Sequence, residues 1–252
     1  MVWKRVDQIL AVLFPIRCLL CGQATPGPAP VCPGCRGDLP WIDAGTPGPG
    51  LIPGVQVRCA LRYEYPVDRL VAAAKFGRQL PVARGLGQLL AAAMPALSLP
   101  PDAVVPVPLH WRREADRGFN QAEEIARGLC DDRNWPLRVD LCRRVRPTPE
   151  QSALGAAGRR ENLRGAFAVV NPRALARCRH VLLVDDVLTT GATVAALASV
   201  FQAAGVQQLT VWAAAHTPPP AEPAQSRQLP GTQVGAIARP GVRPETFVSR
   251  PV

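Results

Sequence analysis

Residues 181–205, VLLVDDVLTTGATVAALASVFQAAG, constrain the fold more than any other stretch of the chain. An apolar run leads to Asp185 and Asp186, a short polar turn ends at Gly191, and apolar residues then recur at helical spacing. A strand that passes through a tight turn into a helix is typical of an open α/β sheet, in which ligands bind at the carboxyl ends of the strands. The segment therefore predicts a parallel α/β sheet flanked by helices, with the two acids at its binding edge.

The turn and the two acids together suit a ribose 5-phosphate. The first backbone N–H groups of a helix have no partner within the helix and lie at the positive end of its dipole, so a phosphate can bind there. Gly191 lets the backbone come close to the phosphate. Hydroxyl groups add donors from Thr189, Thr190 and Thr193. The carboxylates of Asp185 and Asp186 can accept hydrogen bonds from ribose hydroxyls, directly or through Mg²⁺ and its waters. An aspartate pair alone would also fit a metal-binding or phosphoacceptor sheet, and the TTGAT sequence favours the sugar phosphate.

Strands are expected to alternate with helices between residues 55 and 216, as in a parallel sheet. The expected strands are 57–65, 103–107, 166–170, 180–184 and 208–214, with 137–141 as a strand or a loop edge. The expected helices are 67–76, 82–97, 118–130 and 191–204.

Four cysteines near the N-terminus form two pairs, Cys18-x₂-Cys21 and Cys32-x₂-Cys35. Four thiolates complete the tetrahedral coordination of Zn²⁺ and leave no open position, so the predicted metal site is structural. Disulfides of a secreted protein are the alternative, which the expected absence of a signal sequence disfavours. The sequence thus predicts an amphipathic helix and a zinc module in residues 1–42. The remaining cysteines are expected to be small buried hydrophobic residues: Cys59, Cys130, Cys142 and Cys178.

Composition marks the flanks of the expected 55–216 domain. Residues 43–54 are rich in Gly and Pro and are interpreted as a linker, and the proline-rich residues 217–252 as a disordered tail. No segment reaches the length of a membrane-spanning helix, and the apolar run 9–14 is too short for a signal sequence. We therefore expect a cytoplasmic protein without membrane insertion. The net charge of +10, almost all from arginine, gives weak support for a phosphate-rich partner.

Taken together, these motifs resemble the ComF competence family. The resemblance covers about residues 5–216 and rests on CLLC…CPGC, AKFGRQ, VVPVPLHWRREADRGFNQAEEIAR, TPEQSALGAAGRRENLRGAF and VDDVLTTGAT. It implies a type I phosphoribosyltransferase-like domain behind N-terminal zinc knuckles. The implied ligand is phosphoribosyl pyrophosphate or a nucleotide 5′-phosphate, held with Mg²⁺.

The resemblance also implies roles for three cationic segments. The loop 106–123 would face a pyrophosphate through Arg112, Arg113 and Arg117, although a solvated basic loop is the alternative. The segment 151–167 resembles a mobile lid carrying Arg159, Arg160 and Arg164, although a surface turn is the alternative. Lys75 lies where the family usually has Lys, an aromatic residue and Gly-Asp. Here Gly77 is followed by Arg78, which leaves the role of that loop open.

Three functions remain open at this stage. The resemblance implies a role in DNA uptake and single-stranded DNA handling during natural transformation, beside a helicase-like ATPase. Aromatic residues, at 5% of the chain, offer few base-stacking surfaces, and the absence of a GxxxxGK[ST] loop assigns any motor to another protein. The second function is an active phosphoribosyltransferase in nucleotide salvage or related metabolism, for which no catalytic residue is identified. Val2 disfavours its glutamine-hydrolysing type, which begins with a nucleophilic cysteine. The third is metabolism of an unknown ligand.

Overall fold

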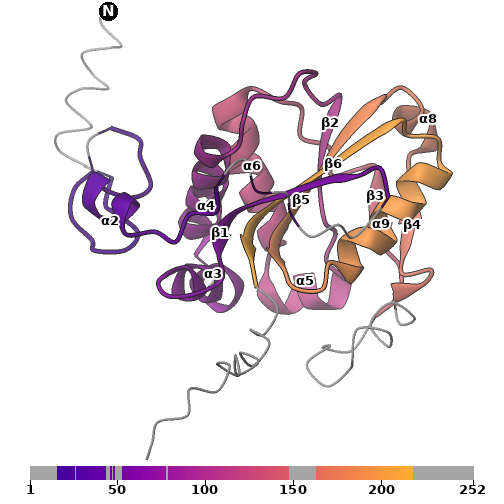
Figure 1. Cartoon of the computed structure of the whole chain (residues 1–252). Coiled ribbons are helices and arrows are strands. Elements are labelled where there is room, and N and C mark those ends of the chain that lie inside the picture. The colour runs from indigo at the N-terminus through magenta and orange to yellow at the C-terminus, as the bar shows by residue number, and fades with distance from the viewer. Residues whose placement is uncertain are drawn as a thin grey trace, which may run out of the picture. The chain divides into compact units, whose positions relative to one another are not determined.

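The computed structural model describes residues 16–25, 27–43, 46, 48, 53–77, 79–147 and 163–217 (Figure 1). Its helices are α2 (Pro33–Gly37), α3 (Val67–Phe76), α4 (Leu80–Ala93), α5 (Trp111–Arg117), α6 (Gln121–Arg133), α8 (Pro172–Leu175) and α9 (Ala192–Ala203). Its strands are β1 (Gln56–Arg62), β2 (Ala103–Pro106), β3 (Cys142–Arg144), β4 (Phe167–Val169), β5 (His180–Leu188) and β6 (Gln208–His216).

The central sheet has four parallel strands in the order β1-β6-β5-β2. Strand β5 is much longer than β2, and the ladder between the two strands ends where Pro106 pairs with Val184. The ladder with β6 continues to the pairing of Leu188 with His216. Among the strands that the structure describes, the last four residues of β5, 185–188, are therefore partnered by β6 alone. A second, antiparallel pair is formed by β3 and β4.

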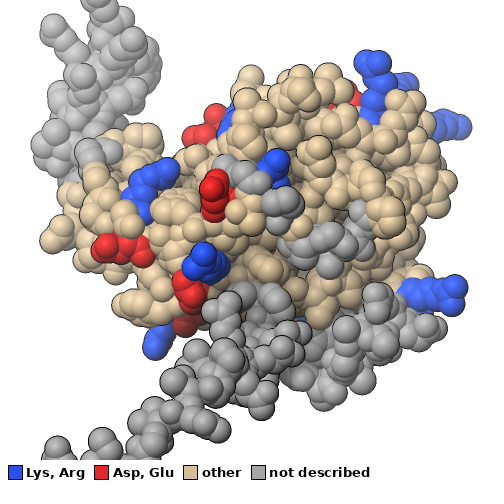
Figure 2. Space-filling model, viewed as in Figure 1, with Lys and Arg blue, Asp and Glu red and all other residues tan. Residues whose placement is uncertain are grey.

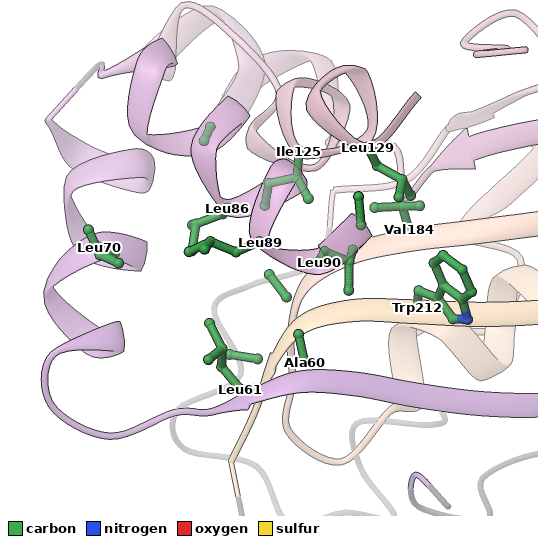
Figure 3. Close-up of a cluster of buried hydrophobic side chains, with 14 of the residues drawn as sticks. Ala60, Leu61, Leu70, Leu86, Leu89, Leu90, Ile125, Leu129, Val184 and Trp212 are labelled. Atoms are coloured by element: carbon green, nitrogen blue, oxygen red, sulfur yellow. The ribbon is translucent and has the colours of Figure 1, made fainter. Parts of the chain in front are cut away.

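Helices cover both faces of the sheet, which explains why β5 begins with a continuous apolar run. On one face Val184 and Trp212 share a buried cluster with Leu90 of α4 and Ile125 of α6 (Figure 3). On the other face, Phe201 and its neighbours in α9 share a second cluster with β3 and β4. The parallel sheet flanked by helices that the sequence predicts is confirmed.

Helices α4 and α6 cross at glycine residues that bring their backbones unusually close. A Cβ atom at Gly87 would lie 2.1 Å from the carbonyl oxygen of Ile125. One at Gly128 would lie 2.2 Å from the carbonyl oxygen of Arg84. Either methyl group would overlap backbone, so both positions require glycine. This contact fixes the position of α6, whose first residue reaches the carboxyl end of β5.

The cysteine-bearing segment packs directly on the α/β domain. Cys18, Val31 and Leu39 belong to the same buried cluster as the sheet. A Cβ at Gly85 of α4 would lie 2.4 Å from Leu19 Cδ1, which shows how closely the segment approaches the helix. The metal-binding segment and the sheet therefore share one hydrophobic core.

The expected helix 67–76 is confirmed with the same bounds as α3. The expected helix 118–130 begins later, at Gln121, because Gly118 ends α5 with a φ of 85° and Asn120 caps α6 through a hydrogen bond from the Ala122 N–H. Helix α5 itself was not expected. Segment 137–141 is not a strand: Leu137 makes one isolated bridge to Val104.

Several expectations concern residues outside the described ranges. They are the N-terminal helix, most of the linker 43–54 and the tail from residue 218 onward. Within the described part of the chain, no helix is both long and apolar enough to cross a membrane.

Candidate functional site at the carboxyl edge of the sheet

The two aspartates lie within β5, in the part that extends beyond β2. Asp185 pairs in register with Ala213 of β6, and Asp186 follows it. The strand ends at Leu188, and α9 begins at Ala192 after the short turn. The sequence places the acids at the end of the strand, whereas the structure continues the strand for two further residues. Both aspartates nevertheless lie at the carboxyl edge of the sheet.

Asp186 is almost fully buried and is held by residues from two other elements. Its Oδ2 lies 2.9 Å from the Nζ of Lys75 at the end of α3. The same oxygen accepts a hydrogen bond of 3.1 Å from the Nε2 of Gln121 at the start of α6. Gln121 in turn accepts a hydrogen bond of 3.0 Å from Arg117 of α5. Segments more than a hundred residues apart in sequence thus meet at one carboxylate.

Asp185 has different surroundings, as expected for neighbouring residues of a strand. Burial, followed by the negative charge of Asp186, raises the pKa of Asp185, and the positive charges of Lys75 and Arg144 oppose the rise. Burial and the charge of Asp185 also raise the pKa of Cys59 to about 12. Cys59 belongs to the cluster on the α9 face, whereas Asp186 contacts α3 and α6. The two carboxyl groups are therefore not equivalent.

The turn after β5 leads into α9 without a side-chain cap. Gly191 is the N-cap residue, with a φ of 67°, and provides no capping side chain. The first intrahelical bond of this turn runs from the Ala195 N–H to the Gly191 carbonyl oxygen. Thr189 is exposed, while Thr190 and Thr193 are partly buried. A 12-residue helix that begins without a side-chain cap can bind an anion through its backbone N–H groups.

The predicted arginines fall into three groups. Arg112, Arg113 and Arg117 all belong to α5, and Arg117 joins the Asp186 network through Gln121. Arg164 lies elsewhere, beside an open groove along the outer face of α9. Arg159 and Arg160 lie outside the described residues.

Two residues at this edge were not predicted from the sequence to contribute to the site. Gln121 contacts an aspartate 65 positions away, and only its place directly after the helix-capping Asn120 marks it in the sequence. Arg144 is partly buried, and this burial, together with the charge of Arg113, lowers its pKa. No local pattern distinguishes Arg144 from the other arginines of the chain.

The four paired cysteines converge as the spacing predicts. The Sγ atoms of Cys18, Cys21, Cys32 and Cys35 all lie within 4.8 Å of one another. The Sγ atoms of Cys21 and Cys32 are 3.8 Å apart. Zinc–sulfur bonds of about 2.3 Å give a tetrahedron with edges of roughly 3.8 Å. Burial opposes ionisation of Cys18, yet the backbone N–H groups of Cys21 and Cys32 lower its pKa to about 6, which favours a thiolate. The cluster fits a structural Zn²⁺.

Comparisons with known proteins found relatives both for the cysteine-bearing segment and for most of the chain. The double zinc ribbon domain family matches residues 9–46. Competence protein F of Haemophilus influenzae is 35% identical over 156 residues, which cover 60% of this chain and 68% of that protein. The DNA utilization protein YhgH of Escherichia coli K12 is 32% identical over 210 residues, which cover 79% of this chain and 90% of that protein. The chain belongs to the ComF family.

Solved structures similar to this ComF-family chain include two larger enzymes. One is the allosteric regulatory enzyme of purine biosynthesis, with a TM-score of 0.36 and 20% identity over 52% of this chain. The other is the glutamine phosphoribosylpyrophosphate amidotransferase of B. subtilis, with a TM-score of 0.37 and 21% identity over 56% of this chain. The chain spans about a quarter of the length of these enzymes, at 25% and 27%.

Proposed function

We propose that this ComF-family protein binds a phosphoribosyl ligand or a nucleotide 5′-phosphate with Mg²⁺ at the carboxyl edge of β5. We also propose that it acts in DNA uptake and single-stranded DNA handling in the cytoplasm, beside a helicase-like ATPase. The observation that carries the proposal is the direct succession of Asp185, Asp186 and the uncapped start of α9. The names of the relatives, competence protein F and DNA utilization protein, support the DNA role.

The charge and hydrogen-bonding capacity of each group determine which part of the ligand it would contact. The backbone N–H groups at the start of α9 and the hydroxyls of Thr189, Thr190 and Thr193 suit the 5′-phosphate. The carboxylates suit ribose hydroxyls or the waters of Mg²⁺, which supplies positive charge next to a diphosphate. Lys75 already neutralises Asp186, with 2.9 Å between Nζ and Oδ2, so this charge is balanced before a ligand arrives. Lys75 and Arg117 place two cations where a diphosphate could contact them.

A calorimetric titration with phosphoribosyl pyrophosphate and Mg²⁺ tests whether the protein binds the proposed ligand. The double variant Asp185→Asn with Asp186→Asn should lose at least tenfold in affinity, because its amides cannot supply the negative charge that Mg²⁺ requires. Asp140→Asn is the matched control, because Asp140 is an exposed acid paired with Arg138 on another loop. Equal affinities of the double variant and the native chain would refute the site. Pyrophosphate release in the same mixture would indicate transfer chemistry in place of binding alone.

The DNA role is tested by the salt dependence of oligonucleotide binding. If arginines neutralise backbone phosphates, the logarithm of the binding constant should fall linearly with the logarithm of salt concentration, by about 0.7 for each phosphate of a single strand. Fluorescence anisotropy of a labelled (dT) oligonucleotide gives this slope. Failure of the native chain to bind at low salt would refute the DNA role and leave the phosphoribosyl site standing.

A further inference from the structure

Three aromatic side chains are largely exposed among the residues that the structure describes. Tyr65 is 76% exposed, Phe76 is 72% exposed and Trp111 is 64% exposed. Large aromatic side chains normally bury most of their surface, since they contribute strongly to a hydrophobic core. In a chain with only 5% aromatic residues, three of them exposed call for a physical reason.

The positions of these side chains follow the carboxyl edge of the sheet. Tyr65 lies in the connection after β1, Phe76 is the last residue of α3, and Trp111 begins α5 after β2. Helices α3 and α5 lie at the same end of the sheet in Figure 1. The preceding residue of α3, Lys75, contacts Asp186, so Phe76 adjoins the proposed ligand site.

Two of the aromatic rings are stacked with arginines of one helix. The guanidinium carbon of Arg117 lies 5.3 Å from the centre of the Phe76 ring. That of Arg112 lies 5.2 Å from the centre of the Trp111 ring. Helix α5 thus presents an arginine beside each ring, at both of its ends. Such cation–π pairs hold planar cations and aromatic rings together at a solvent-exposed surface.

Alternating aromatic rings and arginines fit a single-stranded nucleic acid better than another partner. Bases stack on aromatic rings, and arginines bind the phosphates between them. Charge alone does not explain the surface, because α5 also carries Glu114 and Asp116. Basic and acidic side chains are likewise interspersed on the face shown in Figure 2. The exposed rings therefore offer a means of contact that charge alone does not.

We infer that single-stranded DNA crosses this edge with bases stacked on Phe76 and Trp111 and phosphates against Arg112 and Arg117. We call these four residues the stacking platform. The inference rests on the proposed DNA role and adds the surface that carries it. It does not require the phosphoribosyl ligand to be bound.

Anisotropy titrations of the full chain with a labelled (dT) oligonucleotide test the platform. Trp111→Ala and Phe76→Ala should each weaken binding at least about fivefold, the lower end for loss of one stacked base. Leu99→Ala is the matched control, because Leu99 is also a large exposed apolar residue but lies outside the platform. The circular dichroism spectrum and the unfolding temperature should be unchanged in Trp111→Ala, which separates a local effect from misfolding.

Two further measurements separate stacking from general apolar contact. Trp111→Phe should retain most of the affinity, whereas Trp111→Leu should lose as much as Trp111→Ala, because only a ring can stack. An abasic oligonucleotide should bind the native chain and Trp111→Ala equally. Native oligonucleotide affinity in the leucine variant would show that an apolar side chain without a ring suffices, and it would overturn the inference of base stacking. Native affinity in both alanine variants would overturn the platform alone, whereas no binding by the native chain would remove the proposed DNA role as well.

Discussion

The zinc cluster and the carboxyl edge of β5 are built in opposite ways. All four cysteine ligands lie between Cys18 and Cys35, and their sulfur atoms converge within 4.8 Å. At the β5 edge, Asp186 meets Lys75 and Gln121, which lie 111 and 65 positions away in the sequence. The first site is set by local spacing and the second by the packing of helices on a sheet.

This difference determines which substitutions disrupt each site. A local metal site depends on its own ligands, so one substitution removes it. A site assembled from distant elements depends on the helices that hold it, so substitutions far from the ligand weaken it. Helix α4 links the two, because it contacts Leu19 at Gly85 and α6 at Gly87.

Loss of the zinc ligands should give the largest effect. Cys18→Ser with Cys21→Ser should abolish zinc binding and lower the unfolding temperature on the order of ten degrees, since structural zinc contributes several kcal/mol to folding. The stability of the sheet should fall too, because Cys18 belongs to the shared core. Elemental analysis and thermal unfolding measure both changes. Cys178→Ser should keep its zinc, and a zinc-free double variant with native stability would refute the shared core.

Disrupting the α4–α6 contact should affect the β5 edge without touching the metal. Gly128→Ala places a methyl group against the Arg84 carbonyl oxygen and should lower the free energy of unfolding by about 2–3 kcal/mol. Ligand affinity should fall because α6 carries Gln121, while the zinc content should stay the same. Urea unfolding measures the stability. Gly37→Ala meets open space and serves as the control, and equal midpoints for the two variants would contradict the argument.

The Lys75–Asp186 pair should show coupling in a double-mutant cycle. Lys75→Met leaves a nearly buried carboxylate with hydrogen bonds from Gln121 and the Val187 N–H but without the lysine charge, whereas the further change Asp186→Asn removes the charge that needs compensation. We expect a coupling free energy of about 1–3 kcal/mol from urea unfolding of the four proteins. Strictly additive effects would show that the ion pair is not maintained in solution.

The smallest effect should appear as a pH dependence of stability. Burial, together with the charges of Arg112, Arg144 and Arg113, lowers the pKa of His110 below its ordinary value of 6.5. The neutral ring caps α5 by accepting a hydrogen bond from the Arg112 N–H. As the pH falls below 6.5, the unfolded chain takes up this proton first, so the contribution of His110 to stability is lost. His110→Asn, which can cap without titrating, should lose less stability between pH 7 and pH 5, and parallel curves would refute the assignment.

Local signals predicted most of the fold. Helix α3 was predicted with its observed bounds, since Pro66 precedes its start and Gly77 follows its end. The cysteine spacing predicted the metal cluster, and the β5–α9 segment predicted two aspartates at the carboxyl edge of the sheet. Helix α5 was missed because its seven residues, WRREADR, carry no apolar face. The partnership of Asp186 with Gln121 was also missed, because nothing within either segment specifies a contact made through the α6 packing.

The overhang of β5 has a consequence for solubility. Among the strands that the structure describes, β5 has no partner on the β2 side beyond Val184, and an unpaired strand edge is a template for self-association. Here the N–H groups of Asp186 and Val187 donate to the carboxylates of Asp185 and Asp186. An approaching strand would therefore meet occupied donors and two acidic groups. We therefore expect these two acidic residues to disfavour pairing of this segment with a further strand.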